Sequence, residues 1–207
     1  MGGASIATDA ISDVFSHVGA FVGVDGGADH LLAAGITPAA VVGDLDSLSD
    51  QARAIFADAL HEVTEQSTTD FEKALTRVAS PVVLALGFTG GRLDHTLSVL
   101  NVMARHQQHA ILLIDTYDVS FIAGAEGVVL EVPQGTRISI MPLGQVYVSV
   151  SGVQWSFDKM LMTPNGFTSP SNIALGGAVT VDADGPVLIT LPRALLPSLL
   201  QAAARVE

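Results

Sequence analysis

The sequence predicts an α/β fold, with an N-terminal parallel-sheet α/β domain followed by a C-terminal antiparallel β-sandwich domain. Two observations support this prediction. Up to about residue 115, continuous apolar segments of strand length alternate with segments of helical pattern, which is typical of a parallel sheet covered on both faces. Beyond that point, short β-like segments separated by Gly, Pro and Asn follow one another without a helical pattern between them. That second rhythm is typical of a sandwich or barrel.

Strands and helices alternate through the first half of the chain. Residues 20–24 are expected to form a strand, and the short helix that follows over 28–34 ends at Gly35. The remaining strands are expected at 41–42, 62–64, 82–86 and 110–114, and the remaining helices at 49–60, 71–79 and 96–105. Ser47 and Asp50 have the spacing of a capping box before the helix at 49–60. Gly2 and Gly3 form a turn with no strand ahead of it, although a sheet of this kind normally begins with one.

The second half of the chain is predicted to contain strands followed by a final helix. Strands are expected at 119–123, 128–132, 137–141, 146–150, 178–181 and 187–191. Apolar residues at helical spacing predict a final helix over 193–205 that covers the fold. The domain boundary is expected between residues 115 and 127, which gives domains of about 1–120 and 121–207.

Composition excludes several classes of function. The chain has 207 residues and a net charge of −12, which argues against binding to nucleic acid or to an anionic membrane surface. Its apolar runs are too short for a membrane helix. The absence of cysteine excludes disulfides and thiolate metal sites and is compatible with a cytoplasmic location. Since 49% of the residues are apolar, some of this surface is expected to be buried between subunits.

Five aspartates in the first half each follow or adjoin an apolar run: Asp25, Asp44, Asp46, Asp70 and Asp94. Carboxylates that lie in turns at the ends of apolar segments indicate a bound cation. The expected cation is Mg²⁺ in complex with polyphosphate, because Mg²⁺ prefers hard oxygen ligands. Asp44 and Asp46 are two residues apart and repel each other unless a cation lies between them. The alternative for GDLDS is ordinary turn and cap chemistry. The acidic set as a whole indicates nucleotide-dependent chemistry.

The segment GFTGGRLDH contains Gly90, Gly91, Arg92 and Asp94 between an expected strand and an expected helix. Glycines allow a backbone to approach a ligand, and arginine binds phosphate oxygens in a bidentate manner. The motif is neither a Walker A sequence nor a Rossmann fingerprint. The alternative is a plain strand–turn–helix loop in which Arg92 pairs with Asp94.

Two further segments are candidates with strong structural alternatives. In STTDFEKAL, Asp70 and Lys73 stand at a helix start, where a capping box alone explains the pattern. In the second half, Trp155 is the one tryptophan of the chain, and a core or interface anchor is its usual role. Ser171 and Asn172 form either a polar ligand contact or a turn.

Taken in order, the motifs resemble the thiamin pyrophosphokinase family from residue 22 to residue 191. They read VDGGADHLLAAGITPAAVVGDLDS, TTDFEKAL, GGRLDHTLSVLNVM, GVQWSF and SNIAL. The resemblance implies an α/β catalytic domain that binds nucleotide and a β-sandwich domain for thiamin binding and dimerisation. It also implies a homodimer with two sites at the subunit interface, and transfer of diphosphate from ATP to thiamin with release of AMP.

The resemblance also implies roles for individual residues. The expected magnesium ligands are Asp44, Asp46 and Asp70, and the catalytic set adds Arg92 and Asp94. ATP-binding positions are expected at Asp25, Gly26, Gly27, Lys73, Gly90, Gly91 and Arg92. Thiamin contacts are expected at Asp94 and, from the other subunit, at Trp155, Ser171 and Asn172.

One departure from the family pattern keeps alternatives open. Ile173 stands where the family commonly has an acid beside the thiamin pocket. A diphosphokinase of related fold that acts on a pterin alcohol is therefore the nearest alternative enzyme. A non-catalytic dimer that binds thiamin or nucleotide is the alternative from another class, although such a module has no need for so many metal ligands.

Overall fold

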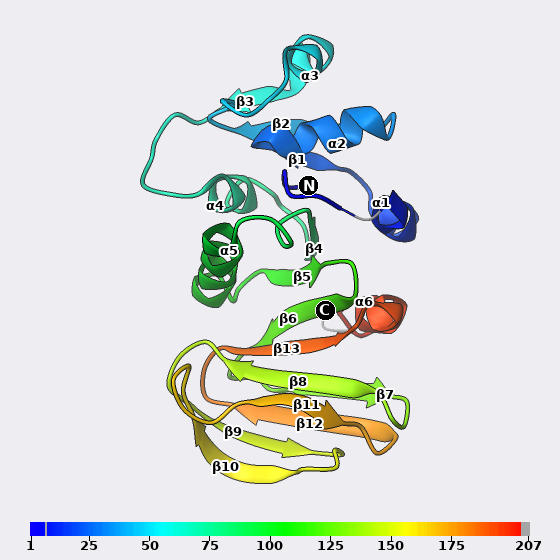
Figure 1. The fold of residues 1–207 in the computed structure, drawn as a ribbon, viewed down its shortest axis with the longest axis vertical. Coiled ribbons are helices and arrows are strands. Elements are labelled where there is room, and N and C mark those ends of the chain that lie inside the picture. The colour runs from blue at the N-terminus through cyan, green and yellow to red at the C-terminus, as the bar shows by residue number, and fades with distance from the viewer. Residues whose placement is uncertain (7, 204–207) are drawn as a thin grey trace. The chain divides into compact units, whose positions relative to one another are not determined.

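Three short parallel strands form the first sheet, in the order β1-β2-β3 (Figure 1). In this computed structural model, which describes residues 1–6 and 8–203, they are β1 (Val22–Val24), β2 (Ala40–Gly43) and β3 (Leu60–Glu62). Val24 pairs with Val42, and Val42 with His61, in parallel register. The predicted parallel sheet at the N-terminus is confirmed.

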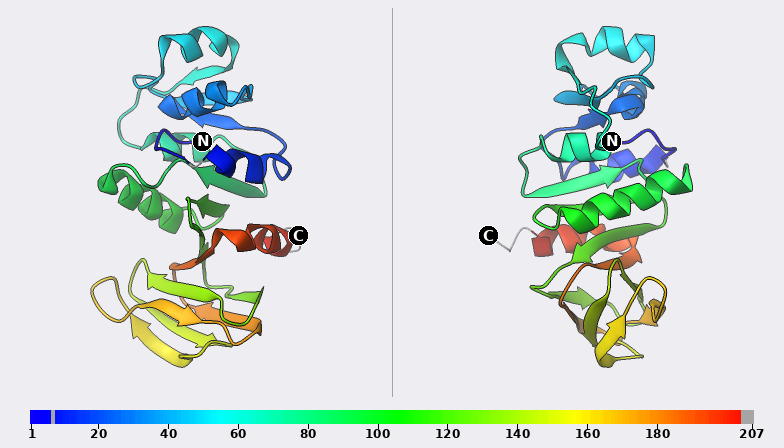
Figure 2. Two further views of the ribbon diagram at one scale, coloured as in Figure 1. Left: turned by 45° about the vertical axis from the view of Figure 1, so that its right-hand side comes forward. Right: turned by 90° about the vertical axis from the view of Figure 1, so that its left-hand side faces the viewer.

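Strand β2 is covered on both faces, which explains why it is apolar throughout. Val41 packs with residues of helices α2 (Ala28–Ala33) and α3 (Asp50–Ile55), whereas Val42 packs with Ala74 of helix α4 (Asp70–Leu75). Successive side chains of a strand point to opposite faces of the sheet, so the helices lie on two sides, as Figures 1 and 2 allow the reader to follow.

The first residues of the chain lie beside β1. The Met1 amino group donates to the Val22 carbonyl at 2.8 Å, and the Val24 N–H donates to the Met1 carbonyl at 2.8 Å. On the other side, the Gly2 N–H donates to the Leu86 carbonyl at 2.7 Å. Met1 and Gly2 are thus hydrogen-bonded on both sides, and the chain then bends at Gly3 and Ala4.

The chain divides into two compact units. The first comprises Met1–Ser80, Leu84–Val102 and Ile114–Thr116, and the second comprises Pro81–Val83, Met103–Leu113 and Tyr117–Glu207. Strands β4 (Val82–Leu86) and β5 (Ala110–Ile114) and helix α5 (Leu93–Arg105) contribute residues to both. The boundary expected near residue 120 stays a prediction.

The second unit is built mainly from antiparallel strands. These are β6 (Asp118–Ala123), β7 (Val128–Val132), β8 (Arg137–Pro142), β9 (Val146–Ser151), β10 (Phe157–Met162), β11 (Ser169–Ile173), β12 (Gly177–Ala183) and β13 (Val187–Pro192). One sheet has the order β10-β9-β12-β7, and the other has the order β11-β8-β13-β6-β5-β4. Inward residues alternate along these strands, as in β13, where Val187, Ile189 and Leu191 are buried. The expected antiparallel second half is confirmed.

Several elements differ from the sequence-based expectation. Helix α1 (Thr8–Phe15) and strands β10 and β11 were not expected, and the strand expected at 62–64 lies at Leu60–Glu62. The helix expected at 49–60 ends at Ile55 and continues as a 3₁₀ turn, Ala57–Ala59. The final helix, α6, spans Leu196–Ala203 after a 3₁₀ turn at Arg193–Leu195, and residues 204 and 205 of the expected helix lie outside the described residues. Among the described residues, no helix is long and apolar enough to cross a membrane.

Candidate functional site

The ends of β1 and β2 bring three carboxylates together. Asp25 follows the last residue of β1, and Asp44 follows Gly43, the last residue of β2. The two strands are parallel neighbours, so their carboxyl ends meet at one edge of the sheet, the usual place of a ligand crevice in such folds. One carboxylate oxygen from each of Asp25, Asp44 and Asp46 lies within 4.8 Å of the others. This group is called the acidic cluster below.

The electrostatics of the acidic cluster favour a cation. Burial raises the pKa of the Asp25 carboxyl, and the negative charge of Asp70 raises it further, whereas hydrogen bonds from Gly26 and Ser47 oppose the rise. A hydrogen bond from Gln66 lowers the pKa of Asp44, and the positive charge of Lys73 acts in the same direction. Since like charges this close repel, a divalent ion would relieve the repulsion.

The backbone of the acidic cluster adopts an uncommon conformation. Asp25 has φ of 47° and Leu45 has φ of 63°, both in the left-handed region that residues other than glycine rarely adopt. The Leu45 side chain is buried with Val41 and Phe56, and its carbonyl accepts a 2.5 Å hydrogen bond from Arg53. Packing therefore holds the strained turn that presents Asp44 and Asp46, as is common at functional sites.

Hydrogen bonds from Ser47 fix two of the carboxylates. The Ser47 N–H donates to Asp25 Oδ1 at 3.3 Å, and its hydroxyl donates to Asp46 Oδ1 at 2.9 Å. Helix α3 begins next to this loop, and its N-cap is Ser49, whose Oγ accepts from the Ala52 N–H at 3.1 Å. The expected cap at Ser47 is therefore replaced by Ser49, which leaves Ser47 to bind the aspartates.

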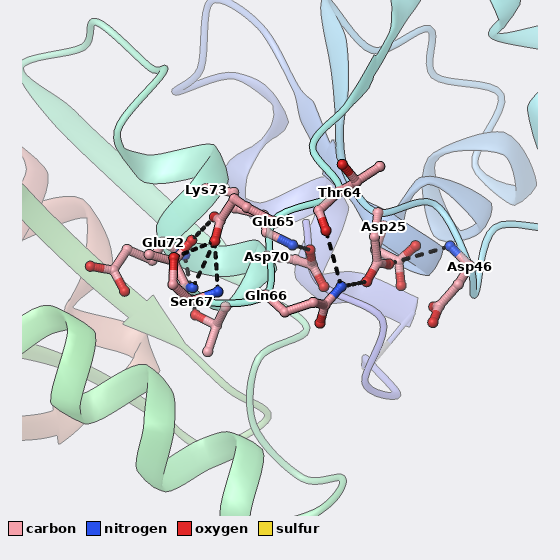
Figure 3. Close-up of polar contacts among 12 residues, drawn as sticks. Asp25, Asp46, Thr64, Glu65, Gln66, Ser67, Asp70, Glu72 and Lys73 are labelled. Carbon is pink, nitrogen blue, oxygen red and sulfur yellow. Dashed lines mark hydrogen bonds and ion pairs between the residues drawn. The ribbon is translucent and has the colours of Figure 1, made fainter.

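The loop between β3 and α4 adds a neutral donor to the site (Figure 3). Gln66 Nε2 donates to Asp44 Oδ2 at 3.2 Å and to the Thr64 carbonyl at 3.5 Å. Glu65 accepts from the backbone N–H groups of Ser67 and Thr68 at 2.7 and 3.1 Å and from both of their hydroxyls. The carboxylate of Glu65 thus orders the loop that places Gln66.

Asp70 and Lys73 lie at the start of α4, which Thr69 caps by accepting from the Glu72 N–H. Lys73 is only 2% exposed, and its Nζ donates to Asp70 Oδ1 at 2.9 Å (Figure 3). Asp70 is not among the three residues of the acidic cluster, yet its charge acts on Asp25. The Asp70–Lys73 ion pair therefore lies next to the acidic cluster and places the buried positive charge of Lys73 beside it.

The segment after β4 presents Arg92 and Asp94 as an exposed ion pair. Arg92 Nε and Nη2 donate to the two oxygens of Asp94 at 3.2 and 2.6 Å, and the side chains are 69% and 65% exposed. This contact lowers the pKa of Asp94 and raises that of Arg92. An ion pair this exposed is screened by water and contributes little to stability, so an incoming anion can compete for Arg92. The pairing anticipated as the alternative reading is present.

The glycines of the loop after β1 and of the loop after β4 differ in how much space a side chain would find there. A Cβ atom on Gly26 would lie 3.0 Å from the Ser47 carbonyl, and one on Gly27 would collide with the Met1 carbonyl. Gly90 has φ of 79° with open space around it, and Gly91 meets nothing closer than the Ala4 Cβ at 3.4 Å. Close packing therefore explains Gly27, whereas a turn with φ above zero explains Gly90.

The expected thiamin-contacting residues lie in the second unit. Trp155 is 55% exposed, Ser171 is exposed, and Asn172 is 1% exposed. Asn172 hydrogen-bonds to the backbone of Trp155 through both ends of its side-chain amide. The structure thus places Trp155 and Asn172 in direct contact.

Sequence reasoning missed Gln66 and Ser47 as contributors to the site. Both are polar residues in loops, where such residues are ordinary. The signal available in the sequence was their position in loops that also carry candidate aspartates. The sequence groups Asp25 with the other four aspartates, and the resemblance implies an ATP-binding role for it; the structure brings its carboxylate within 4.8 Å of those of Asp44 and Asp46.

Sequence comparison relates this chain to a known protein family. Residues 11–114, half of the chain, match the family described as "Thiamin pyrophosphokinase, catalytic domain". A thiamine pyrophosphokinase 1 from Oryza sativa subsp. japonica is 24% identical over 173 residues, which cover 74% of this chain and 66% of that relative. The match to the thiamine pyrophosphokinase of Bacillus subtilis is 37% identical over 90 residues, 40% of this chain and 42% of that one. The chain spans less than two thirds of the length of the rice relative.

Solved structures share the fold. The thiamin pyrophosphokinase from Geobacillus thermodenitrificans aligns with a TM-score of 0.77 at 22% identity, covering 92% of this chain and 94% of its own. The enzyme from Candida albicans aligns with a TM-score of 0.78 at 14% identity, covering 91% and 87%. The chain belongs to the thiamin pyrophosphokinase family.

Proposed function

We propose that this chain is a thiamin pyrophosphokinase, which transfers diphosphate from ATP to the hydroxyl group of thiamin and yields thiamin diphosphate and AMP. The observation that supports this most directly is the acidic cluster at the carboxyl ends of two parallel strands, in a chain of this family. We further propose that it acts in the cytoplasm as a homodimer with sites at the subunit interface, as the family resemblance implies.

The donor set of the acidic cluster fits Mg²⁺. Asp25, Asp44 and Asp46 supply carboxylate oxygens within 4.8 Å of one another, and Mg²⁺ is usually held by one or two carboxylates together with substrate phosphates. Asp44 and Asp46 are the proposed main ligands, and Asp25 is added to them by its position. Asp70 remains a proposed ligand on the side of Lys73. When bound, Mg²⁺ would neutralise phosphate charge.

Two cationic side chains, Lys73 and Arg92, bind the polyphosphate. Lys73 is buried, and its ion pair with Asp70 at 2.9 Å holds its ammonium group in place. The positive charge of Lys73 acts on Asp44. Arg92 exchanges Asp94 for phosphate oxygens and stabilises either the AMP leaving group or the transferred diphosphate. Gly26, Gly90 and Gly91 let the backbone approach the nucleotide, while Gly27 packs against Met1 next to them. Asp94, released from Arg92, contacts the acceptor.

The chemical step forms one bond and breaks another. The hydroxyl oxygen of thiamin attacks the β-phosphorus of ATP, the bond from that phosphorus to the α,β-bridging oxygen breaks, and AMP departs. The hydroxyl proton passes to a carboxylate, for which Asp46 and Asp70 are the two candidates. Catalysis of this kind depends mainly on alignment and charge stabilisation. The thiazolium cation is accepted by the exposed face of Trp155.

The experiment that tests this function follows AMP and thiamin diphosphate when ATP, Mg²⁺ and thiamin are mixed with the protein. We expect the two products in equal amounts, and none after chelation of divalent ions. Asp46→Asn should lower kcat by about 100-fold or more while thiamin binding, measured by titration calorimetry, is largely retained. Asp58→Asn, at an exposed aspartate of the same unit, is the matched control and should remain active.

Three results would count against the proposal. Release of AMP with a pterin alcohol and not with thiamin would favour the related diphosphokinase. Thiamin binding without any AMP would favour the non-catalytic dimer. Equal turnover by Asp46→Asn and the unaltered protein would remove the proposed role of Asp46.

A further inference from the structure

The side chain of Asn172 uses all of its hydrogen-bonding capacity inside the second unit. Oδ1 accepts from the backbone N–H of Trp155 at 3.1 Å and from that of Ile173 at 3.0 Å. Nδ2 donates to the Trp155 carbonyl at 2.9 Å and to Ser169 Oγ at 3.2 Å. A carboxamide has two acceptor positions and two N–H groups, and at 1% exposure none of the four is left for a ligand.

The backbone around Trp155 explains why a side chain is needed there. Gln154 N–H still donates to the Ile173 carbonyl at 2.8 Å, and Val153 bridges Ala174 in antiparallel fashion. At Trp155 this pairing stops, because the chain turns toward β10. The register of β11 also shifts between Ser169 and Asn172. Asn172 then binds both polar groups of the Trp155 backbone, as a paired strand otherwise would.

The indole remains available although its backbone is held. Trp155 is 55% exposed, so the residue is not buried in the core. A large apolar side chain in water is usually mobile, and ordering it on binding costs free energy. A fixed backbone with an exposed ring lowers that cost for a flat or cationic ligand.

We infer that Asn172 is a positioning residue, which does not touch thiamin but holds the turn that presents the Trp155 indole to it. This inference rests on the proposed function, since it takes thiamin as the acceptor. It assigns Asn172 a different part from the direct contact expected from the sequence. The structure offers a direct probe of this role, because Trp155 is the one tryptophan of the chain and intrinsic tryptophan emission reports on it alone.

The first measurement compares tryptophan emission in the unaltered protein, Asn172→Ala and Asn172→Asp. The aspartate keeps the acceptor oxygen but loses both N–H groups and sets an oxygen against the Trp155 carbonyl. We expect both variants to show lower steady-state anisotropy and stronger quenching by acrylamide. Ser120→Ala is the matched control, because it removes a 2.8 Å side-chain hydrogen bond to Thr190 in the same unit; it should leave both readings unchanged.

The second measurement titrates thiamin against the same proteins and follows product formation. We expect the dissociation constant from emission quenching and the KM for thiamin to rise together by about 10-fold, with kcat and the KM for ATP within about twofold of the unaltered values. A purely structural role would not give this split. Should Asn172→Ala fail to fold, as judged by circular dichroism, the nearly isosteric Asn172→Asp carries the comparison.

The outcomes separate the two proposals. Unchanged anisotropy in the folded variants overturns the inference, and so does lower anisotropy with unchanged thiamin affinity. If the unaltered protein makes no thiamin diphosphate and binds no thiamin, the proposed function fails instead, and the anisotropy comparison still decides whether Asn172 holds Trp155.

Discussion

A Cβ atom built on Gly43 would lie 3.0 Å from the Cβ of Asp25 and 3.3 Å from its backbone nitrogen. Contacts this close are tighter than ordinary van der Waals contacts, so a side chain at residue 43 would press on the backbone and side chain of Asp25. Gly43 immediately precedes Asp44, and Asp25 immediately follows β1. The spacing of the acidic cluster therefore depends on a glycine that carries no ligand itself.

Gly43→Ala should separate Asp25 from Asp44 and weaken metal-dependent turnover. Because the added methyl group presses on the backbone as well as on a side chain, we expect a stability loss of about 1–3 kcal/mol and a fall in kcat of about 10-fold, with a higher Mg²⁺ requirement. Thermal unfolding and an AMP assay across Mg²⁺ concentrations measure both. Gly19→Ala, where no atom lies within 4 Å, is the control; equal losses in the two variants would contradict the argument.

Asp25→Asn should stabilise the protein when no divalent cation is present. Burial raises the pKa of this carboxyl, so its ionised form is unfavourable in the folded state at neutral pH. Since the side chain is partly exposed and screened, the gain is small, a rise in Tm of about 2 °C. The raised pKa means that the cost is present above that pKa and absent below the ordinary value of 3.8.

Melting curves from pH 3 to pH 8 in a chelator, roughly spanning both ionisation states, check the prediction for Asp25→Asn. The difference from the unaltered protein should shrink as the pH falls. With Mg²⁺ added, the unaltered protein should gain Tm and Asp25→Asn should gain less. A variant that is less stable at neutral pH without metal would show that Asp25 is not destabilising.

Strand periodicity explains how the chain positions of the aspartates could be predicted. A buried parallel strand reads as a short apolar run, and the residue that follows it necessarily lies at the sheet edge, as Asp25 and Asp44 do. Which carboxylates meet depends on strand register and on the left-handed turns at Asp25 and Leu45. Nothing in the local sequence marks a leucine for that conformation, so the grouping of Asp25 with Asp46 required the structure.

The unexpected strands of the second unit have a local explanation. Strand β11 has the sequence SPSNI, and proline together with serine and asparagine ordinarily marks a turn. Strand β10 reads FDKMLM, which lacks regular alternation, and its register shifts between Phe157 and Met160. Pairing with β8 and β9 overrides these weak local preferences. The antiparallel character of this half was predictable from the strands that do alternate.

Gln66→Met should raise the Mg²⁺ concentration needed for half-maximal activity. The amide of Gln66 donates to Asp44 and is the largest cause of its lowered pKa, while methionine keeps the length of the side chain without a donor. Loss of a hydrogen bond that orients a metal ligand typically weakens metal binding by about 10-fold or more. Gln51→Met, at an exposed position of α3, is the control, and an unchanged Mg²⁺ requirement in Gln66→Met would show that Asp44 needs no such support.

The carboxylate of Glu65 should titrate far below the ordinary range. Hydrogen bonds from Ser67 and Thr68 lower its pKa from 4.5 to about 2, and heteronuclear NMR of the side-chain carboxyl measures the midpoint. A lowered folded-state pKa stabilises the ordered loop above about pH 4.5, and that contribution is lost as the pH falls toward 2. Replacing both hydroxyl residues by alanine should return the midpoint toward 4.5 and, because Gln66 lies between them and Glu65, raise the Mg²⁺ requirement in the same direction as Gln66→Met. A midpoint near 4.5 in the unaltered protein would mean that Glu65 does not order this loop.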